Sequence, residues 1–205
     1  MYIFIFYFLS YLKLLFSKDM NLTDLHFIPI DLPIVKINLE KVKYECNYSY
    51  WQFIRLLNFK GKYAESNWTE YALQNFLDLK NYIEKYLPFD YLVNVKINMQ
   101  NTEVLNHVDF TEPNANPFLY TNNKYNEPCG YRILIKGKSD KLFVKNKRTL
   151  LPETTNIYCI GHTNTIHKVE EDIGRITIFV HGCINKYKHT NLLQKSYNKY
   201  KKYCI

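Results

Sequence analysis

The spacing of apolar residues along the chain changes once, after Pro88. Between Trp68 and Tyr86 apolar residues recur every three to four positions, which is the spacing of one face of a helix. Asn67 with Glu70 three residues later has the form of a helix-capping pair, and Pro88 would end the helix. This stretch therefore predicts one helix from Trp68 to Tyr86.

Beyond Pro88 apolar and polar residues alternate, which is typical of short strands. Seven segments fit this pattern: Tyr91–Met99, Val104–Phe110, Tyr131–Lys136, Lys141–Val144, Ile157–Ile160, Thr165–Val169 and Ile173–Val180. Gly137 to Asp140 reads as a hairpin turn between two of them. Pro29 and Pro33, among short apolar runs ahead of the helix, indicate an edge strand. The pattern predicts a mainly β fold with flanking helices, of the sandwich or jelly-roll type.

One long polar segment interrupts the strands. Thr111–Gly130 contains three prolines and many asparagines. Irregular segments of this length inside a compact domain usually serve function or are disordered. We therefore expect this segment to be a loop that helps to select a substrate.

The composition is that of one globular domain. The chain has 205 residues, of which 47% are hydrophobic and 22% charged. Its five cysteines contain no CxxC pair, which argues against a zinc knuckle or a dense disulfide scaffold and favours reduced thiols inside the cell. The sequence is divided into an apolar extension (1–19), one domain (20–185) and a basic segment (186–205).

The two ends of the chain carry the unusual composition. Residues 1–16 are strongly apolar, and three interpretations stay open: an upstream extension or mis-set start, a membrane anchor within residues 1–17, or a packed element. The formal net charge of +8 comes mostly from residues 186–203, which hold six lysines and no acids, leaving +2 for the rest. That segment is either a weak site for an anionic partner, nucleic acid or membrane, or a solvated amphipathic helix or frayed tail. If the segment binds such a partner, it would tether the enzyme, and deletion of residues 186–205 should leave turnover of a small substrate unchanged.

The first candidate site residues are His107 and Asp109. They form an H-x-D motif within a predicted strand, where residues two positions apart point to the same face. An imidazole and a carboxylate would then lie side by side. Alone the motif is weak, because an ordinary exposed pair has the same form.

The second candidate group lies in the segment from Thr165 to Thr177. The polar trio Glu170-Glu171-Asp172 separates two alternating runs, as a three-residue hairpin turn would. If Val169 faces Ile173, His167 lies opposite Arg175 and Thr165 opposite Thr177. Opposed residues have Cβ atoms about 5 Å apart, so His167, Arg175 and Thr177 would line one patch.

Together these residues indicate a metal site with an anion clamp. Two imidazoles and one carboxylate leave three coordination positions open, as in non-haem Fe(II) oxygenases. An arginine set back from the metal binds a distal carboxylate through two hydrogen bonds. A five-carbon keto-diacid would bridge the two. His162 is the rival to His167, and His181 is more typical of a structural or surface histidine. Arg132 is a candidate for contact with substrate or co-substrate and is not assigned to either.

The pattern H-x-D, a later His and an Arg-x-Ser/Thr resembles the 2-oxoglutarate and Fe(II)-dependent dioxygenase superfamily, over roughly Tyr91 to Gly182. Residues 163–180 look most like the aspartyl/asparaginyl hydroxylase-like and phytanoyl-type branches. Arg175 stands at the position where prolyl 4-hydroxylases carry lysine, which argues against that branch. Asp109 departs from aspartyl β-hydroxylases proper and argues against the halogenase variant.

The resemblance implies a double-stranded β-helix of the jelly-roll, cupin-like kind. It implies Fe(II) held by His107, Asp109 and His167, and 2-oxoglutarate as co-substrate, with its far carboxylate on Arg175 and Thr177. Ascorbate is a further cofactor that the family can require. The implied reaction uses O₂ to hydroxylate an unidentified substrate and releases succinate and CO₂. The alternatives are a non-catalytic cupin-like metal- or ligand-binding β-sandwich module and a zinc hydrolase.

Overall fold

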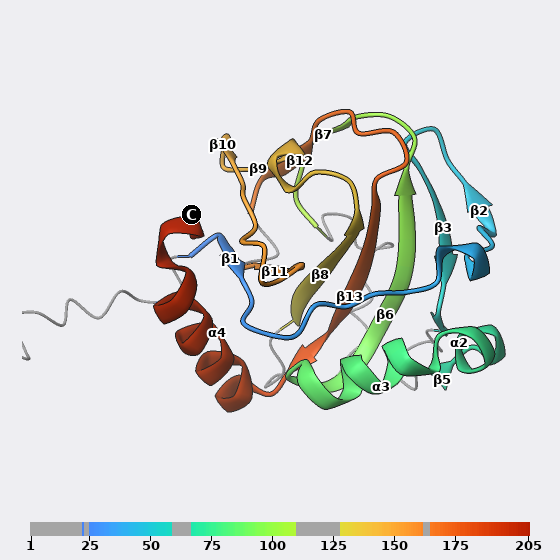
Figure 1. Ribbon diagram of the computed structural model, residues 1–205, viewed down its shortest axis with the longest axis horizontal. Helices are drawn as coiled ribbons and strands as arrows, with labels where there is room; N and C mark the ends of the chain where they lie inside the picture. The colour runs from blue at the N-terminus through green and yellow to red at the C-terminus, as the bar shows by residue number, and fades with distance from the viewer. Residues whose placement is uncertain (1–21, 23–24, 59–66, 110–127, 162–164) are drawn as a thin grey trace, which may run out of the picture.

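The computed structural model describes residue 22 and residues 25–58, 67–109, 128–161 and 165–205. Two antiparallel sheets form its centre (Figure 1). The larger sheet contains, in spatial order, β1 (Phe27–Pro29), β11 (Ile157–Ile160), β8 (Pro128–Lys136), β13 (Ile176–Ile184), β6 (Phe89–Gln100), β3 (Trp51–Arg55) and β2 (Cys46–Asn47). The smaller sheet contains β10 (Lys147–Arg148), β9 (Leu142–Val144), β12 (His167–Val169) and β7 (Val104–His107).

The remaining described elements are short or helical. β4 (Leu57–Asn58) and β5 (Asn67–Trp68) form a separate two-stranded ladder. The helices are α2 (Glu70–Asn75), α3 (Leu77–Tyr86) and α4 (Lys186–Tyr200), and single 3₁₀ turns occur at η2 (Leu39–Lys41), η5 (Ser139–Lys141) and η6 (Lys201–Tyr203).

The pairing of the eight strands from β6 to β13 defines the fold. β6 pairs with β13, β7 with β12, β8 with β11 and β9 with β10, all antiparallel. A long antiparallel hairpin that is rolled into two facing sheets has this nested pairing, and it is the topology of a jelly roll. The mainly β, double-stranded β-helix fold that the sequence predicts is confirmed.

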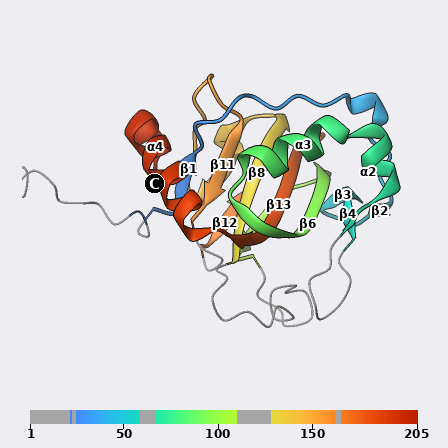
Figure 2. The same ribbon diagram turned by 90° about the horizontal axis from the view of Figure 1, so that it is seen from below.

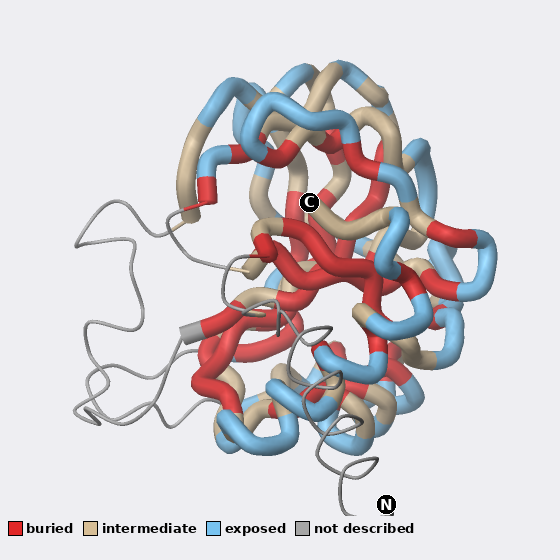
Figure 3. The backbone as a smooth tube through the Cα atoms, turned by 90° about the vertical axis from the view of Figure 1, so that its left-hand side faces the viewer, coloured by how far each residue is buried: buried red, intermediate tan, exposed pale blue. Residues whose placement is uncertain are grey.

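Alternation along β6 and β13 separates the core from the interior of the roll. Val95, Ile97, Ile178 and Val180 are fully buried in the main hydrophobic cluster, which includes Ala72 and Phe76 at α2 and Leu79 and Ile83 of α3. Figure 2 shows these helices lying across the large sheet. The intervening residues face the other sheet, because successive strand side chains point to opposite faces. Figure 3 shows the buried strands surrounded by exposed turns.

The helical region differs from the single predicted helix. Phe76 has a non-helical backbone (φ −133°, ψ 33°) and separates α2 from α3. The N-cap is Thr69, whose hydroxyl accepts a hydrogen bond from the amide of Ala72. Asn67 instead lies in β5 opposite Asn58, so the predicted cap is wrong.

Two predicted hairpins are also wrong, for one reason. β8 and β9 belong to different sheets, so Gly137 to Asp140 carries the chain from one sheet to the other instead of closing a hairpin. Gly137 makes this change of direction with φ of +103°, a value that favours glycine. β12 and β13 likewise lie in different sheets, so His167 is not paired with Arg175.

The basic C-terminal segment is a packed helix. α4 buries Leu193, Ser196 and Tyr200. After the helix, Ile205 exchanges backbone hydrogen bonds with Phe27 of the edge strand β1 (N to O 3.0 and 3.1 Å). The amphipathic helix is therefore the correct one of the alternatives, whereas an anionic partner for its exposed lysines stays a prediction.

Several predictions fall on residues that the structure does not describe. These are the apolar extension 1–19, most of the substrate loop Thr111–Gly130, and His162. Within the described ranges, no helix is both long and apolar enough to cross a bilayer.

Candidate metal centre

His107, Asp109 and His167 lie together between the two sheets. One potential ligand atom of each lies within 4.8 Å of the others. His107 is the last residue of β7 and His167 is the first of β12, and the two are direct partners in the β7·β12 ladder. Their ring centroids are 4.2 Å apart. Asp109 follows β7 just beyond its end, so the H-x-D motif supplies both of its residues although the strand is shorter than expected.

Both imidazoles are oriented in the same way. Nδ1 of His107 lies 2.8 Å from the carbonyl oxygen of Leu105, and Nδ1 of His167 lies 2.8 Å from that of Thr165. A carbonyl oxygen only accepts, so Nδ1 carries the proton in each ring. The lone pair of each ring is therefore on Nε2. In His167 it accepts a hydrogen bond from Nη2 of Arg132 (3.3 Å), which a bound metal would replace. A backbone partner on the second nitrogen is the usual support of a metal-binding histidine.

The protonation states suit a divalent cation. Burial, reinforced by the charge of Arg132, lowers the pKa of His167 to about 4, so its imidazole is neutral at pH 7. Burial by itself would raise the pKa of Asp109, but the neighbouring positive charges, Arg132 foremost, hold that pKa below its usual range. A neutral imidazole and an ionised carboxylate are the forms that bind metal.

Arg132 is a member of the site that the sequence left unassigned. Its Nη2 lies 2.5 Å from Oδ2 of Asp109 and 3.3 Å from Nε2 of His167. It extends from β8 of the large sheet toward ligands held by the small sheet. The signal in the sequence is one charged residue inside an apolar strand, but only the pairing of β8 shows that this residue points inward.

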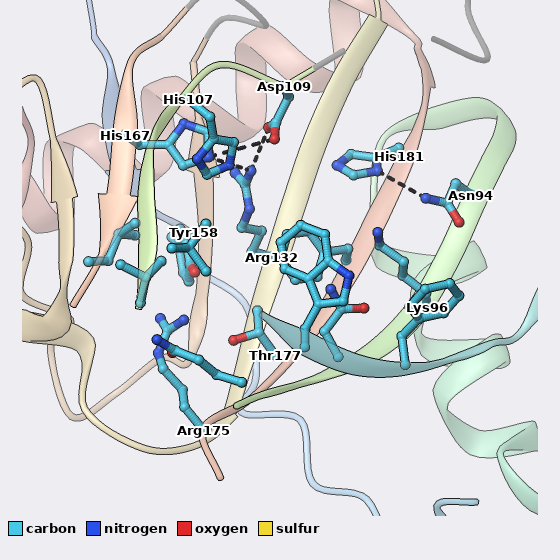
Figure 4. Close-up of a pocket in the computed structure, with 18 of the residues that line it drawn as sticks. Asn94, Lys96, His107, Asp109, Arg132, Tyr158, His167, Arg175, Thr177 and His181 are labelled. Atoms are coloured by element: carbon cyan, nitrogen blue, oxygen red, sulfur yellow. Dashed lines mark hydrogen bonds and ion pairs between the residues drawn. The ribbon is translucent and has the colours of Figure 1, made fainter. Parts of the chain in front are cut away.

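Arg175 and Thr177 line the same cavity as the three candidate ligands. The cavity has a volume of about 620 Å³, and residues of both sheets form its walls. In Figure 4 the ligand trio lies at one end of the drawn site, with Arg175 and Thr177 apart from it. Both side chains are buried, and among the described residues no hydrogen-bond partner exists for Nε and Nη2 of Arg175 or for Oγ1 of Thr177.

These orphaned donors indicate a missing acceptor. A buried guanidinium without a partner loses its hydration and gains nothing in return. A carboxylate would satisfy two parallel N–H groups at once. His167, Arg175 and Thr177 thus line one cavity from facing sheets. They do not form the single hairpin patch that the sequence predicts.

His181, in β13, is buried in the same cavity. Burial lowers its pKa to about 3, so its ring is neutral at pH 7. Its Nδ1 lies 3.5 Å from Nδ2 of Asn94, and it is not in the group of potential metal ligands found among the described residues.

Comparisons with known proteins add little to this geometry. No family model and no curated protein matches the sequence. Among solved structures, the fold is similar to the crystal structure of an oxidoreductase of the 2OG-Fe(II) oxygenase family from Burkholderia pseudomallei, with 10% identity and a TM-score of 0.44 over 69% of this chain and 72% of that chain. At this identity and TM-score, the likeness transfers neither activity nor residue roles to this chain.

Proposed function

We propose that the protein is an Fe(II)- and 2-oxoglutarate-dependent dioxygenase that hydroxylates a substrate bound in the central cavity, with release of succinate and CO₂. One observation carries the proposal. Two imidazoles and a carboxylate converge at one place in the cavity, and elsewhere in it lies a buried guanidinium whose Nε and Nη2 lack a hydrogen-bond partner among the described residues.

The donor set fits ferrous iron. Two imidazole nitrogens and one carboxylate oxygen, all on one side, form the 2-His-1-carboxylate arrangement that leaves open positions for further ligands. Arg132 holds Oδ2 of Asp109, which leaves Oδ1 for the metal. When bound, Fe(II) supplies the redox chemistry that couples O₂ and 2-oxoglutarate to substrate oxidation.

The second carboxylate of 2-oxoglutarate fits the orphaned donors. Arg175 provides a forked pair of N–H groups and Thr177 a hydroxyl, both already desolvated. A ligand held at the metal and at Arg175 is fixed at both ends, so these residues orient the co-substrate.

A zinc hydrolase is less well supported. Such an enzyme commonly uses a second carboxylate as the base beside the metal-bound water. Among the described residues that line the cavity, Asp109 is the one acid, and it belongs to the ligand trio. The requirement for ascorbate and the branch of the superfamily, aspartyl/asparaginyl hydroxylase-like or phytanoyl-type, stay predictions from the sequence.

Turnover without substrate tests the proposal. We expect the purified protein with Fe(II) and 2-oxoglutarate to form succinate slowly in air and none without O₂. His167→Ala should abolish both succinate formation and iron binding. His181→Gln, which changes another buried histidine of the cavity, should still bind one iron per chain. Succinate formation by His167→Ala at the wild-type rate would refute the proposal.

A further inference from the structure

Lys96 occupies an unusual position in the wall of the cavity. It lies on β6 between the core residues Val95 and Ile97, so its side chain points to the interior of the roll. Its Nζ lies 5.5 Å from the ring of Trp51 and 5.3 Å from the rings of Phe53 and Phe179. The aromatic faces partly replace the water around the ammonium group.

Lys96 has no anionic partner in the described structure. No ion pair or side-chain hydrogen bond connects it to an acid, and the carboxylate of Asp109 is paired with Arg132. Burial lowers the pKa of Lys96 to about 8, and the more distant charge of Asp109, which by itself raises this pKa, offsets only part of the effect. A lysine that only filled space would be replaced at lower cost by an apolar residue.

The net charge of the residues that line the cavity also favours an anionic ligand. Four cations line it, namely Arg55, Lys96, Arg132 and Arg175, against one acid, Asp109. A divalent metal adds two positive charges and 2-oxoglutarate removes two, so the complete site would still carry an excess of three. Arg55, whose guanidinium lies 5.8 Å from the ring of Phe53, is on the same side as Lys96.

We propose that the substrate is an acid whose phosphate or carboxylate group pairs with Lys96, and that Lys96 thereby determines substrate specificity. Describing this ligand as the substrate rests on the proposed function; the anion site itself does not. Asn94 lies two positions earlier on the same face of β6, near enough along the strand to contact the same ligand. The three rings around Lys96 offer apolar surface to the part of the molecule beyond its acidic group.

Tryptophan fluorescence offers a direct test. The chain has two tryptophans, and in a Trp68→Phe background Trp51 of the cavity is the sole reporter. The probes are phenyl phosphate and phenylacetate, with uncharged phenylacetamide as the matched control. The full-length chain is titrated with a chelator present and without 2-oxoglutarate, so that this experiment and the turnover test fail independently.

We expect both acids to bind about tenfold or more tightly than the amide, as for a hydrogen-bonded charge pair. The tighter of the two acids identifies the group. Lys96→Met should reduce the affinity for the acids to that for the amide. Lys85→Met, which removes an exposed lysine 4.8 Å from the ring of Tyr86, should change the affinities less than twofold.

Three results would overturn the proposal. The first is equal affinity for acid and amide in the wild-type cavity, a comparison that depends on no variant. The second is undiminished acid binding by Lys96→Met. The third is loss of acid binding in Arg175→Met but not in Lys96→Met, which would place the anion on Arg175.

Discussion

The guanidinium of Arg132 lies 2.5 Å from the carboxylate of Asp109, and this ion pair joins the two sheets at the candidate metal centre. Arg132 is 3% exposed and Asp109 20%. Neither group has full access to water, so each depends on the other for compensation of its charge.

Breaking this pair should destabilise the metal-free protein. Arg132→Met leaves the carboxylate of Asp109 buried without its partner, and Asp109→Asn leaves the guanidinium. We expect each to lower the free energy of unfolding by about 3 kcal/mol. The double variant should lose less than the sum of the two, because it leaves no unpaired charge. Urea unfolding with a chelator measures the cycle, and additive losses would show that the pair is not coupled.

Arg175 should behave as a ligand-binding group and not as a structural one. Its buried N–H groups lack acceptors among the described residues, so Arg175→Met should not lower the Tm of the ligand-free protein. With metal present, saturating 2-oxoglutarate should raise the wild-type Tm by roughly 5 to 10 °C, from about 2.7 kcal/mol of binding at 100 times Kd. This rise in Tm should be absent in Arg175→Met. It should be smaller than in the wild type in Arg175→Lys, because an ammonium group is a point charge and lacks the paired N–H groups of a guanidinium. A lowered Tm together with an intact ligand response would contradict this role.

The buried histidines should make the metal-free protein sensitive to mild acid. Burial lowers the pKa of His181 to about 3 and that of His167 to about 4. An unfolded histidine takes up a proton near pH 6.5, whereas the folded ones do not. Their contribution is therefore fully present above pH 6.5 and is lost as the pH falls toward the folded pKa values.

Each of these two histidines should lower the free energy of unfolding by about 2 kcal/mol as the pH falls from 7 to 5. Denaturant unfolding at the two pH values measures the loss. His181→Gln should lose about 2 kcal/mol less than the wild type over this interval, since His167 still titrates. Equal losses in the two proteins would show that His181 is not buried in its neutral form.

Helix α4 should be part of the folding unit. Leu193 is 7% exposed within the main core cluster, so Leu193→Ala should destabilise the protein by about 2 to 3 kcal/mol. Tyr187, on the same helix and 77% exposed, serves as the control, and its replacement by Ala should change stability by less than about 0.5 kcal/mol. Deletion of residues 186–205 should therefore unfold the domain, in contrast to the harmless deletion expected from the sequence. A deleted chain with wild-type Tm would refute this.

The sequence identified local features of the site better than its long-range pairing. The H-x-D spacing brings His107 and Asp109 together because one residue separates them along the chain. The inward positions of His167, Arg175 and Thr177 followed from alternation. The predicted hairpin register of these residues was wrong, because alternation shows which face a residue occupies but not in which sheet its strand lies.

The features that the sequence missed depend on tertiary packing. Arg132 contacts Asp109 only because β8 lies in the sheet facing the ligands. The break at Phe76 divides a segment whose apolar spacing is continuous, and the cap at Thr69 depends on where the helix leaves β5. The packing of α4 is set by the edge strand β1, from which it is separated by most of the chain.

Anaerobic addition of Fe(II) and then 2-oxoglutarate, followed by visible absorbance, tests the central claim most directly. A metal held by His107, Asp109 and His167 and chelated by the keto-acid end of 2-oxoglutarate should produce a weak visible charge-transfer band. We expect the band in the wild-type protein, its absence in His167→Ala, and a higher 2-oxoglutarate requirement in Arg175→Met. No band in the wild type, or an unchanged band in His167→Ala, would contradict the assignment.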